Sequence, residues 1–190
     1  MDSDGNAVAN TYTLNFSYGS GISVAGAGFL LNNEMDDFAA KPGVPNGFGL
    51  TGGDANAIEG GKRPLSSMTP TMVLKDGRPW LVTGSPGGSR IITTVLQMIV
   101  NVVDHGMNIA DATAVPRIHH QWLPDQLELE SGFSADTVRE LQRRGHSIES
   151  TDAMGSLQSV MREGELFQGA SDPRRPQAGS VGPAMNMATQ

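Results

Sequence analysis

Residues 81–104, LVTGSPGGSRIITTVLQMIVNVVD, hold the pattern that decides the fold. A short apolar run ends at Val82, a glycine-rich turn follows over residues 83–89, and a long apolar segment begins near Arg90. This order predicts a strand, a tight turn and a buried helix. Glycine lets the backbone take positive φ and lets a ligand approach closely, and the first N–H groups of a helix have no intrahelical partner. The turn is therefore either a cradle for an anion or oxyanion, or a purely steric connection.

The composition limits the class of protein. The chain has 190 residues, enough for one domain with a substantial core. Its net charge of −7 argues against nucleic acid or an anionic membrane as a partner. Cysteine is absent, which excludes disulfides and thiolate metal sites. No apolar run reaches the roughly 18 residues of a membrane-spanning helix, and the start, MDSDGNAV, lacks the basic and apolar regions of a signal peptide.

The periodicity of the rest of the chain predicts a layered α+β domain. Strands are expected at 7–15 and 29–32, and hairpins at 71–82 and 160–167. Helices are expected at 90–104, buried on most faces, at 108–114 and at 134–144. Residues 34–64 have little apolar pattern, which is typical of a lid, a binding loop or a disordered segment. Residues 1–174 are expected to form the domain, and residues 175–190 a disordered tail.

The histidines do not predict a metal site. His119 and His120 are adjacent, so they point to opposite sides of an extended chain, and packing is the favoured role. The sequence contains no His-Glu-x-x-His motif and no Gly-x-Ser-x-Gly elbow. We therefore expect neither a metal nor a cofactor.

Polar residues follow the ends of several predicted strands. Carboxylates there could bind an ammonium group, serine hydroxyls a carboxylate, and glycine amides an oxyanion, which together suit a substrate with an amino-acid head and an acyl carbon. Taken singly, each also fits a solvated turn or a cap. The set is Thr13, Asn15, Glu34, Asp36, Asp37, Ser66, Ser67, Gly87 and Gly88.

Seven motifs resemble the small, C-terminal subunit of the γ-glutamyltranspeptidases, over residues 1–174. The resemblance implies an N-terminal-nucleophile hydrolase with an αββα sandwich, made when one precursor cleaves itself into two subunits. It also implies a heterodimer with the large subunit and, from bacterial relatives, a periplasmic or secreted location. The motifs are DGNAVANTYTLN, LLNNEMDDF, KPGVPN, KRPLSSMTPTMV, LVTGSPGGSRIITTVLQ, PRIHHQWLPD and GASDPR.

The resemblance also implies a reaction. An N-terminal threonine attacks a γ-glutamyl amide, such as glutathione or glutamine, with its own α-amine serving as base. The resulting glutamyl-enzyme passes the glutamyl group to water or to an acceptor amino acid or peptide. By motif, Thr13 would hydrogen-bond and help activate the nucleophile, and the Gly87 and Gly88 amides would form the oxyanion hole.

The remaining motif residues would bind the glutamyl group. Asn15 would contact the α-amino or α-carboxylate group of the substrate. Glu34 and Asp37 would hold its α-ammonium, and Ser66 and Ser67 its α-carboxylate.

Three departures from the family pattern limit this resemblance. The nucleophile motif, Thr-Thr-His and an aromatic residue, should lie before Met1, and Thr11 and Thr13 cannot replace it because they lack a free amine. The large subunit supplies a substrate-binding arginine and half of the sandwich. Phe48 stands where many bacterial relatives have a tyrosine gate, so we expect a looser lid. Asp37, in turn, favours glutamyl substrates over those of the related cephalosporin acylases.

Two further hypotheses stay open at this stage. The chain could be a truncated, catalytically inactive fragment that serves only as a structural or substrate-binding half. Least favoured is a nucleotide-binding domain built on the turn at 84–89, which ATP would stabilise against heat.

Overall fold

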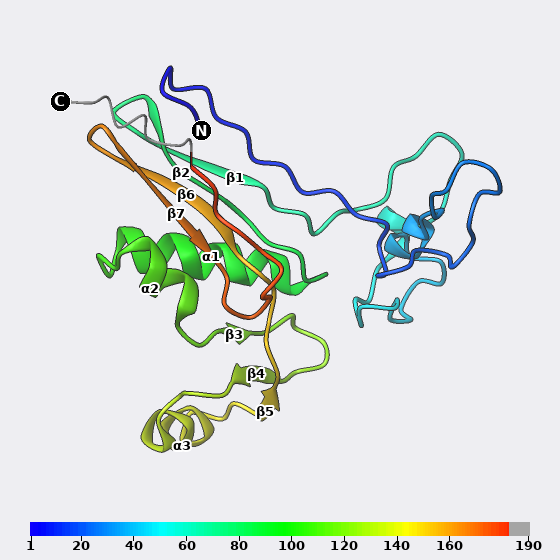
Figure 1. Ribbon diagram of the computed structural model, residues 1–190. Helices are drawn as coiled ribbons and strands as arrows, with labels where there is room; N and C mark the ends of the chain where they lie inside the picture. Colours follow the sequence, from blue (N-terminus) through cyan, green and yellow to red (C-terminus); the bar gives the residue numbers. More distant parts are fainter. Residues whose placement is uncertain (183–190) are drawn as a thin grey trace.

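The computed structural model describes residues 1–182. Its body is a four-stranded antiparallel sheet in the order β1-β2-β6-β7 (Figure 1). The strands are β1 (Thr71–Lys75), β2 (Arg78–Gly84), β6 (Gln158–Glu163) and β7 (Leu166–Ser171). Asp76 and Gly77 turn β1 into β2 with φ of 52° and 75°, values that suit a two-residue hairpin turn. Both predicted hairpins are confirmed.

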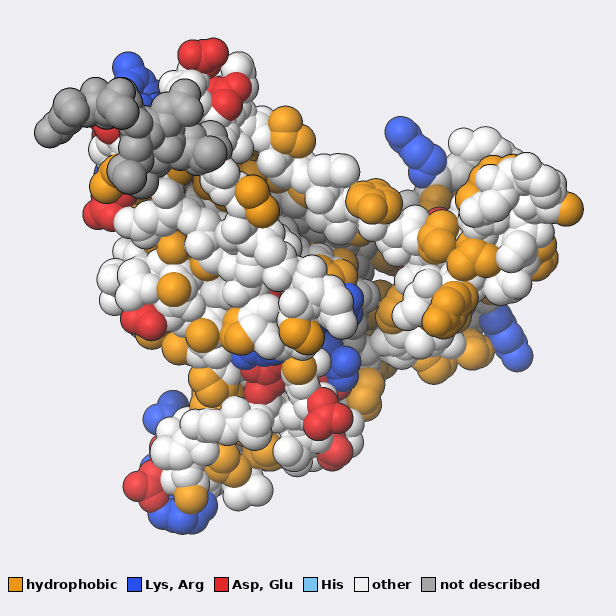
Figure 2. Space-filling view, in the orientation of Figure 1, with side chains coloured by type: hydrophobic (Ala, Val, Ile, Leu, Met, Phe, Trp, Pro, Cys, Tyr) orange, Lys and Arg blue, Asp and Glu red, His pale blue; other side chains and the backbone are white. Residues whose placement is uncertain are grey.

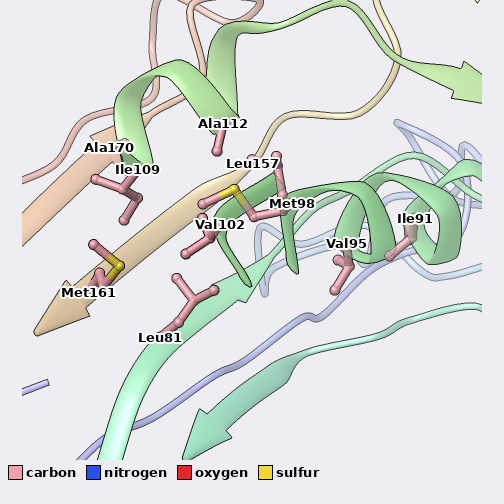
Figure 3. Close-up of a cluster of buried hydrophobic side chains, with 10 residues drawn as sticks. All are labelled: Leu81, Ile91, Val95, Met98, Val102, Ile109, Ala112, Leu157, Met161 and Ala170. Carbon is pink, nitrogen blue, oxygen red and sulfur yellow. The ribbon is translucent and has the colours of Figure 1, made fainter. Parts of the chain in front are cut away.

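Two helices pack on one face of this sheet and form the main core. They are α1 (Arg90–Val103), which ends near Gly106, and α2 (Ile109–Ala114), whose cap Asn108 accepts a hydrogen bond from the Asp111 amide at 2.9 Å. Apolar side chains of the helices meet those on and next to β2, β6 and β7 (Figure 3). The cluster is Leu81, Ile91, Val95, Met98, Val102, Ile109, Ala112, Leu157, Met161 and Ala170.

The expectation that α1 is buried on most faces is wrong. Ile92, Leu96 and Val103 are 51%, 56% and 52% exposed. The sheet covers only one side of the helix, and within residues 1–182 no layer covers the opposite side. The α+β class is confirmed, and in the described residues the four-stranded sheet carries a helix layer on one face.

A second, three-stranded sheet lies below the first in Figure 1. Its strands are β3 (Ile118–His119), β4 (Leu127–Glu130) and β5 (Ile148–Thr151), with β3 antiparallel and β5 parallel to β4. The predicted helix is α3 (Ala135–Arg143), which connects β4 to β5. Ser134 caps it by accepting a hydrogen bond from the Thr137 amide at 3.1 Å.

A buried ion network joins the two sheets. Arg117, which is 2% exposed, donates to the Asp172 carboxylate at 2.6 Å. Glu130, at the end of β4, accepts from the Arg117 amide at 2.9 Å and from Arg174 Nε at 2.8 Å. Because Asp172 directly follows β7, these contacts tie the ends of strands from both sheets together. Charges this deeply buried persist only when they are paired and hydrogen-bonded.

The two strands predicted before residue 33 are not found. Residues 7–15 are extended but form no strand, and residues 29–32 hold only an isolated bridge between Ser23 and Leu30. Within residues 1–182 no neighbouring strand completes a ladder with residues 7–15, and Val8 and Tyr12 are 78% and 88% exposed. Alternation alone therefore does not make a strand, because a strand also needs a partner.

Residues 14–65 form an N-terminal lobe beside the body (Figure 1). Its only helices are the 3₁₀ turns η1 (Glu34–Asp37) and η2 (Asp54–Asn56), so the predicted long loop is confirmed within the described residues. At the other end, residues 175–182 include a turn closed by an Ala178-to-Arg175 backbone bond of 3.0 Å. Residues 183–190, the rest of the tail expected to be disordered, lie outside the described residues. No helix in the described part is long and apolar enough to cross a membrane.

Candidate functional site

A cavity of about 1430 Å³ lies between the N-terminal lobe and the end of β2. Figure 2 shows the hollow between the lobe and the body. Two extended segments line the cavity: the first connection, around residue 13, and the second connection, around residue 66. The glycine turn at the end of β2 also lines it. All of the predicted site residues except Glu34 and Asp36 line it: Thr13, Asn15, Asp37, Phe48, Ser66, Ser67, Gly87 and Gly88.

The glycine turn presents two amides without partners. Gly87 and Gly88 have φ of 142° and 58°. Their carbonyls accept from the amides of Arg90 and Ile91 at 3.2 and 3.1 Å, which starts α1. Within residues 1–182 no hydrogen bond uses the N–H of either glycine. These amides are therefore available to an oxygen atom in the cavity.

Thr13 and Asn15 are fixed by a reversal of the chain. The Thr13 hydroxyl accepts from the Asn15 amide at 2.8 Å, and Asn15 has φ of 75°. The Asn15 side chain donates to the Asn33 carbonyl at 3.1 Å, while Asn33 Oδ1 accepts from the Phe16 amide, also at 3.1 Å. Sequence analysis missed Asn33, although it directly precedes the acidic run and lies within the motif LLNNEMDDF.

Glu34 and Asp37 lie one turn apart on η1, and neither carboxylate forms an ion pair within residues 1–182. Glu34 Oε1 is buried and has no hydrogen-bond partner within residues 1–182. Burial raises the pKa of Glu34, and the charge of Asp37 raises it further. Burial likewise raises the pKa of Asp37, and the charge of Asp36 adds to the effect. A positively charged ligand would relieve both shifts.

Asp36 belongs to a different contact. Its carboxylate accepts from the Gly47 amide at 3.1 Å, and its carbonyl accepts from the Asn46 side chain at 3.2 Å. Asp36 therefore holds the loop 46–48 against η1, whereas Asp37 faces the cavity.

Ser66 and Ser67 line the cavity on the opposite connection. The Ser66 hydroxyl accepts from the Met68 amide at 3.2 Å. The Ser67 carbonyl accepts from the Thr69 hydroxyl at 2.9 Å. Ser66 is thus a turn cap and a cavity residue at once, so two roles considered as alternatives are compatible.

Phe48 spans the cavity and contacts the glycine turn. A Cβ added to Gly88 would lie 2.6 Å from the Phe48 ring, which shows how closely the ring packs on the turn. The ring also meets Phe16 edge-on, with centroids 5.3 Å apart. Gln121 donates to the Phe48 carbonyl at 3.4 Å and accepts from the Ser89 hydroxyl at 2.7 Å. Gln121 lies in the motif PRIHHQWLPD but was not predicted as a site residue. Its side chain links Phe48 to Ser89 at the start of α1.

The adjacent histidines do point to different surroundings. His119 is 3% exposed, and its two ring nitrogens face Thr93 Oγ1 at 2.8 Å and Gln121 Oε1 at 3.0 Å. His120 faces Asp125 at 3.1 Å. Among the described residues no group of three or more His, Asp or Glu side chains is placed to hold a metal ion.

Comparison with known proteins agrees with this geometry. The sequence profile of the γ-glutamyltranspeptidase family matches residues 1–182. The chain belongs to the γ-glutamyltranspeptidase family. It is 64% identical to a glutathione hydrolase proenzyme of Escherichia coli over 176 residues, which are 92% of this chain and 30% of that protein.

Solved γ-glutamyltranspeptidase structures share the fold. The Helicobacter pylori γ-glutamyltranspeptidase T380A mutant aligns with a TM-score of 0.90 at 56% identity, covering 92% of this chain and 97% of that chain. An acivicin-inhibited γ-glutamyltranspeptidase aligns with a TM-score of 0.89 at the same identity, covering 92% of this chain and 96% of that chain. The chain spans about a third of the length of the curated relatives that it matches.

Proposed function

We propose that this chain is the small-subunit part of an enzyme that cleaves γ-glutamyl amides such as glutathione. The glutamyl group passes to water or to an acceptor amino acid or peptide. The observation that carries the proposal is the single cavity lined by the Asp37 carboxylate, two serines and two glycines whose amides have no partner within residues 1–182. These groups match the ammonium, carboxylate and acyl carbon of one glutamyl substrate.

The geometry supports separate binding positions for the different groups of the substrate. Glu34 and Asp37 hold the α-ammonium of the substrate, and Ser66 and Ser67 hold its α-carboxylate. The scissile carbonyl oxygen then points at the glycine amides, which stabilise the negative charge that develops on it. Asn15 contacts the amino-acid head from the first connection.

In this proposal the nucleophile is a threonine of the precursor that lies upstream of the part formed by this chain. Its hydroxyl attacks the γ-carbonyl and its α-amine takes the hydroxyl proton. The proton then passes to the amide nitrogen as the C–N bond breaks, so that the leaving group departs as an amine. Thr13 hydrogen-bonds the attacking oxygen, because its own hydroxyl is already oriented by the Asn15 amide. A second attack, by water or by an acceptor amine, releases the glutamyl group.

The proposed partner is the large subunit of the same precursor. It would supply an arginine for the substrate carboxylate and the remaining layers of the sandwich. The exposed apolar face of α1 supports a partner of this kind. A periplasmic or secreted location is proposed from the resemblance to bacterial relatives alone.

The test is a precursor that carries this chain as its C-terminal part. We expect it to cleave into two subunits and to release the chromophore of a γ-glutamyl anilide. Alanine in place of the upstream threonine, the matched control, should abolish release. A folded, cleaved heterodimer that binds a glutamyl ligand without turnover would instead support the inactive binding half.

A further inference from the structure

Ser85 supports the glycine turn from behind. It follows β2 directly and is 3% exposed. Its hydroxyl donates to the Pro86 carbonyl at 2.7 Å and accepts from the Ser156 amide at 2.8 Å. Because the hydroxyl both donates and accepts, these two partners fix its direction.

The Pro86 carbonyl determines where the Gly87 amide points. The two groups belong to one planar peptide unit, and this peptide bond is trans. In a trans peptide the C=O and the N–H point in opposite directions. A hydroxyl that holds the Pro86 carbonyl therefore also sets the orientation of the N–H of Gly87, a residue that lines the cavity.

Gly155 allows this contact by its lack of a side chain. A Cβ at Gly155 would lie 2.6 Å from Ser85 Oγ and 3.2 Å from the Pro86 carbonyl oxygen. Its Cα lies 3.4 Å from the position of a Cβ added to Gly87. The backbone of Gly155 and Ser156 thus packs directly against Ser85 and the glycine turn.

The segment 154–157 is held firmly on both sides. The Leu157 amide donates to Asp172 at 2.7 Å, and the Met154 amide donates to Glu130. Both carboxylates belong to the buried ion network that joins the sheets. The Ser156 amide that orients Ser85 therefore has a rigid support.

We propose that Ser85 is a positioning residue for the glutamyl-transfer reaction, with its hydroxyl aligning the Gly87 amide of the oxyanion hole through the Pro86 carbonyl. This inference rests on the proposed function. Ser85 touches no substrate in this scheme, so it acts through the turn. Its loss should reduce stabilisation of the transition state and leave binding of the glutamyl head unchanged.

The test compares Ser85→Ala with Ser159→Ala in the cleaved heterodimer. Ser159 is also buried and hydrogen-bonded, but its partner is the Thr83 side chain of β2, at 2.7 Å, and not the Pro86 carbonyl. Removing one donor from an oxyanion hole costs about 10²–10³ in kcat. Misaligning a donor should cost part of that, so for Ser85→Ala we expect kcat to fall by roughly 10-fold. For Ser85→Ala, KM should change by less than about twofold. Ser159→Ala should lower Tm by a similar amount but leave kcat unchanged.

Further variants keep the test decisive. Ser85→Cys fills the space of the serine side chain, but its thiol is a weak hydrogen-bond donor. It should therefore show an intermediate kcat, and it tests the role of Ser85 even if Ser85→Ala does not fold. Gly155→Ala should repeat the loss of kcat, because its Cβ meets Ser85 Oγ. Rates are normalised to the cleaved subunit.

Two results separate this inference from the function on which it rests. An active parent enzyme whose kcat is unchanged in Ser85→Cys and Gly155→Ala, or changed as much by Ser159→Ala, overturns the role of Ser85 alone. A parent heterodimer without turnover refutes the proposed function itself.

Discussion

Glu34 and Asp37 form a pair of carboxylates at the edge of the cavity, and Asp37 lines it. Two carboxylates one turn apart repel each other, and partial burial removes the water that would screen them. One Glu34 oxygen has no hydrogen-bond partner within residues 1–182. Such an arrangement is unfavourable in the empty protein and becomes favourable when an ammonium group enters. In the proposed function, the pair would therefore favour a substrate with a cationic head group.

Replacing Asp37 by asparagine tests this role. A hydrogen bond to a charged group contributes about 1.5–3 kcal/mol, so KM for a γ-glutamyl substrate should rise by roughly 10- to 100-fold. The effect on kcat should be smaller, because the reacting carbon is bound elsewhere. Asp54→Asn, in the same lobe but exposed on η2, is the control and should leave KM unchanged. An equal rise in both variants would contradict the assignment.

The pH dependence follows from the same pair. Both carboxyls have raised pKa values, so they take up protons at a higher pH than ordinary carboxyls. KM should therefore rise as pH falls through this range, and Asp37→Asn should flatten the profile. For stability the sign is opposite. The folded pKa lies above the unfolded one, so the contribution of the pair is largest below the unfolded pKa and is lost as pH rises through the folded pKa. A KM that is constant across the acidic range would refute the first expectation.

At the scale of elements, local signals predicted local structure well. The Asp76-Gly77 turn, the Asn108 and Ser134 caps and the apolar run of α1 each carry their information within a few residues. The glycine turn was located for the same reason. Residues 7–15 failed as a strand because ladder partners come from elsewhere, and no sequence window contains them.

The site residues were predicted from motifs, but the hydrogen bonds that join them to the rest of the chain were not. Asn33 and Gln121 act on residues distant in sequence, Gln121 across 73 residues to Phe48. The network of Arg117 and Asp172 likewise joins residues 55 apart. Contacts of this kind follow from the packing of whole elements, which propensity and spacing do not encode.

Asp172→Asn tests the contribution of that network. It leaves the Arg117 guanidinium buried without its charge partner, which typically costs about 3–5 kcal/mol. The free energy of unfolding of the heterodimer, measured in urea, should fall by that amount. Glu140→Gln removes the exposed ion pairs with Arg143 and Arg144 and should leave the free energy of unfolding nearly unchanged.

Acid should unfold the parent through the same residue. Burial alone would raise the pKa of Asp172, but hydrogen bonds from the Arg174 amide and the Arg117 side chain outweigh it, so its pKa is lowered. Its contribution is present above the unfolded pKa and is lost as pH falls through the folded pKa. The acid limb of the stability curve should therefore be shallower in Asp172→Asn. An unchanged limb would show that other carboxylates dominate.

At the scale of the molecule, the exposed apolar surface does not suit an isolated chain. The outer face of α1 carries Ile92, Leu96 and Val103, and exposed hydrophobic side chains gather over the N-terminal lobe (Figure 2). Val8 and Tyr12 add to this surface along the first connection. Exposed apolar side chains in such number are typical of a protein interface. The cavity is bounded by the same lobe and connection, so a partner that covers this surface would also fix the walls of the site.

The isolated chain should therefore self-associate. Size-exclusion chromatography of residues 1–190 alone should show oligomers or aggregates, whereas coexpression with the large subunit should give a soluble one-to-one complex. Leu96→Glu places a charge on the outer face of α1 and should reduce self-association of the isolated chain. Leu166→Glu, at the far hairpin and 71% exposed, is the matched control and should have little effect. A monomeric isolated chain with a cooperative melting transition would contradict this prediction, because the apolar face of α1 would then be tolerated in water without a partner.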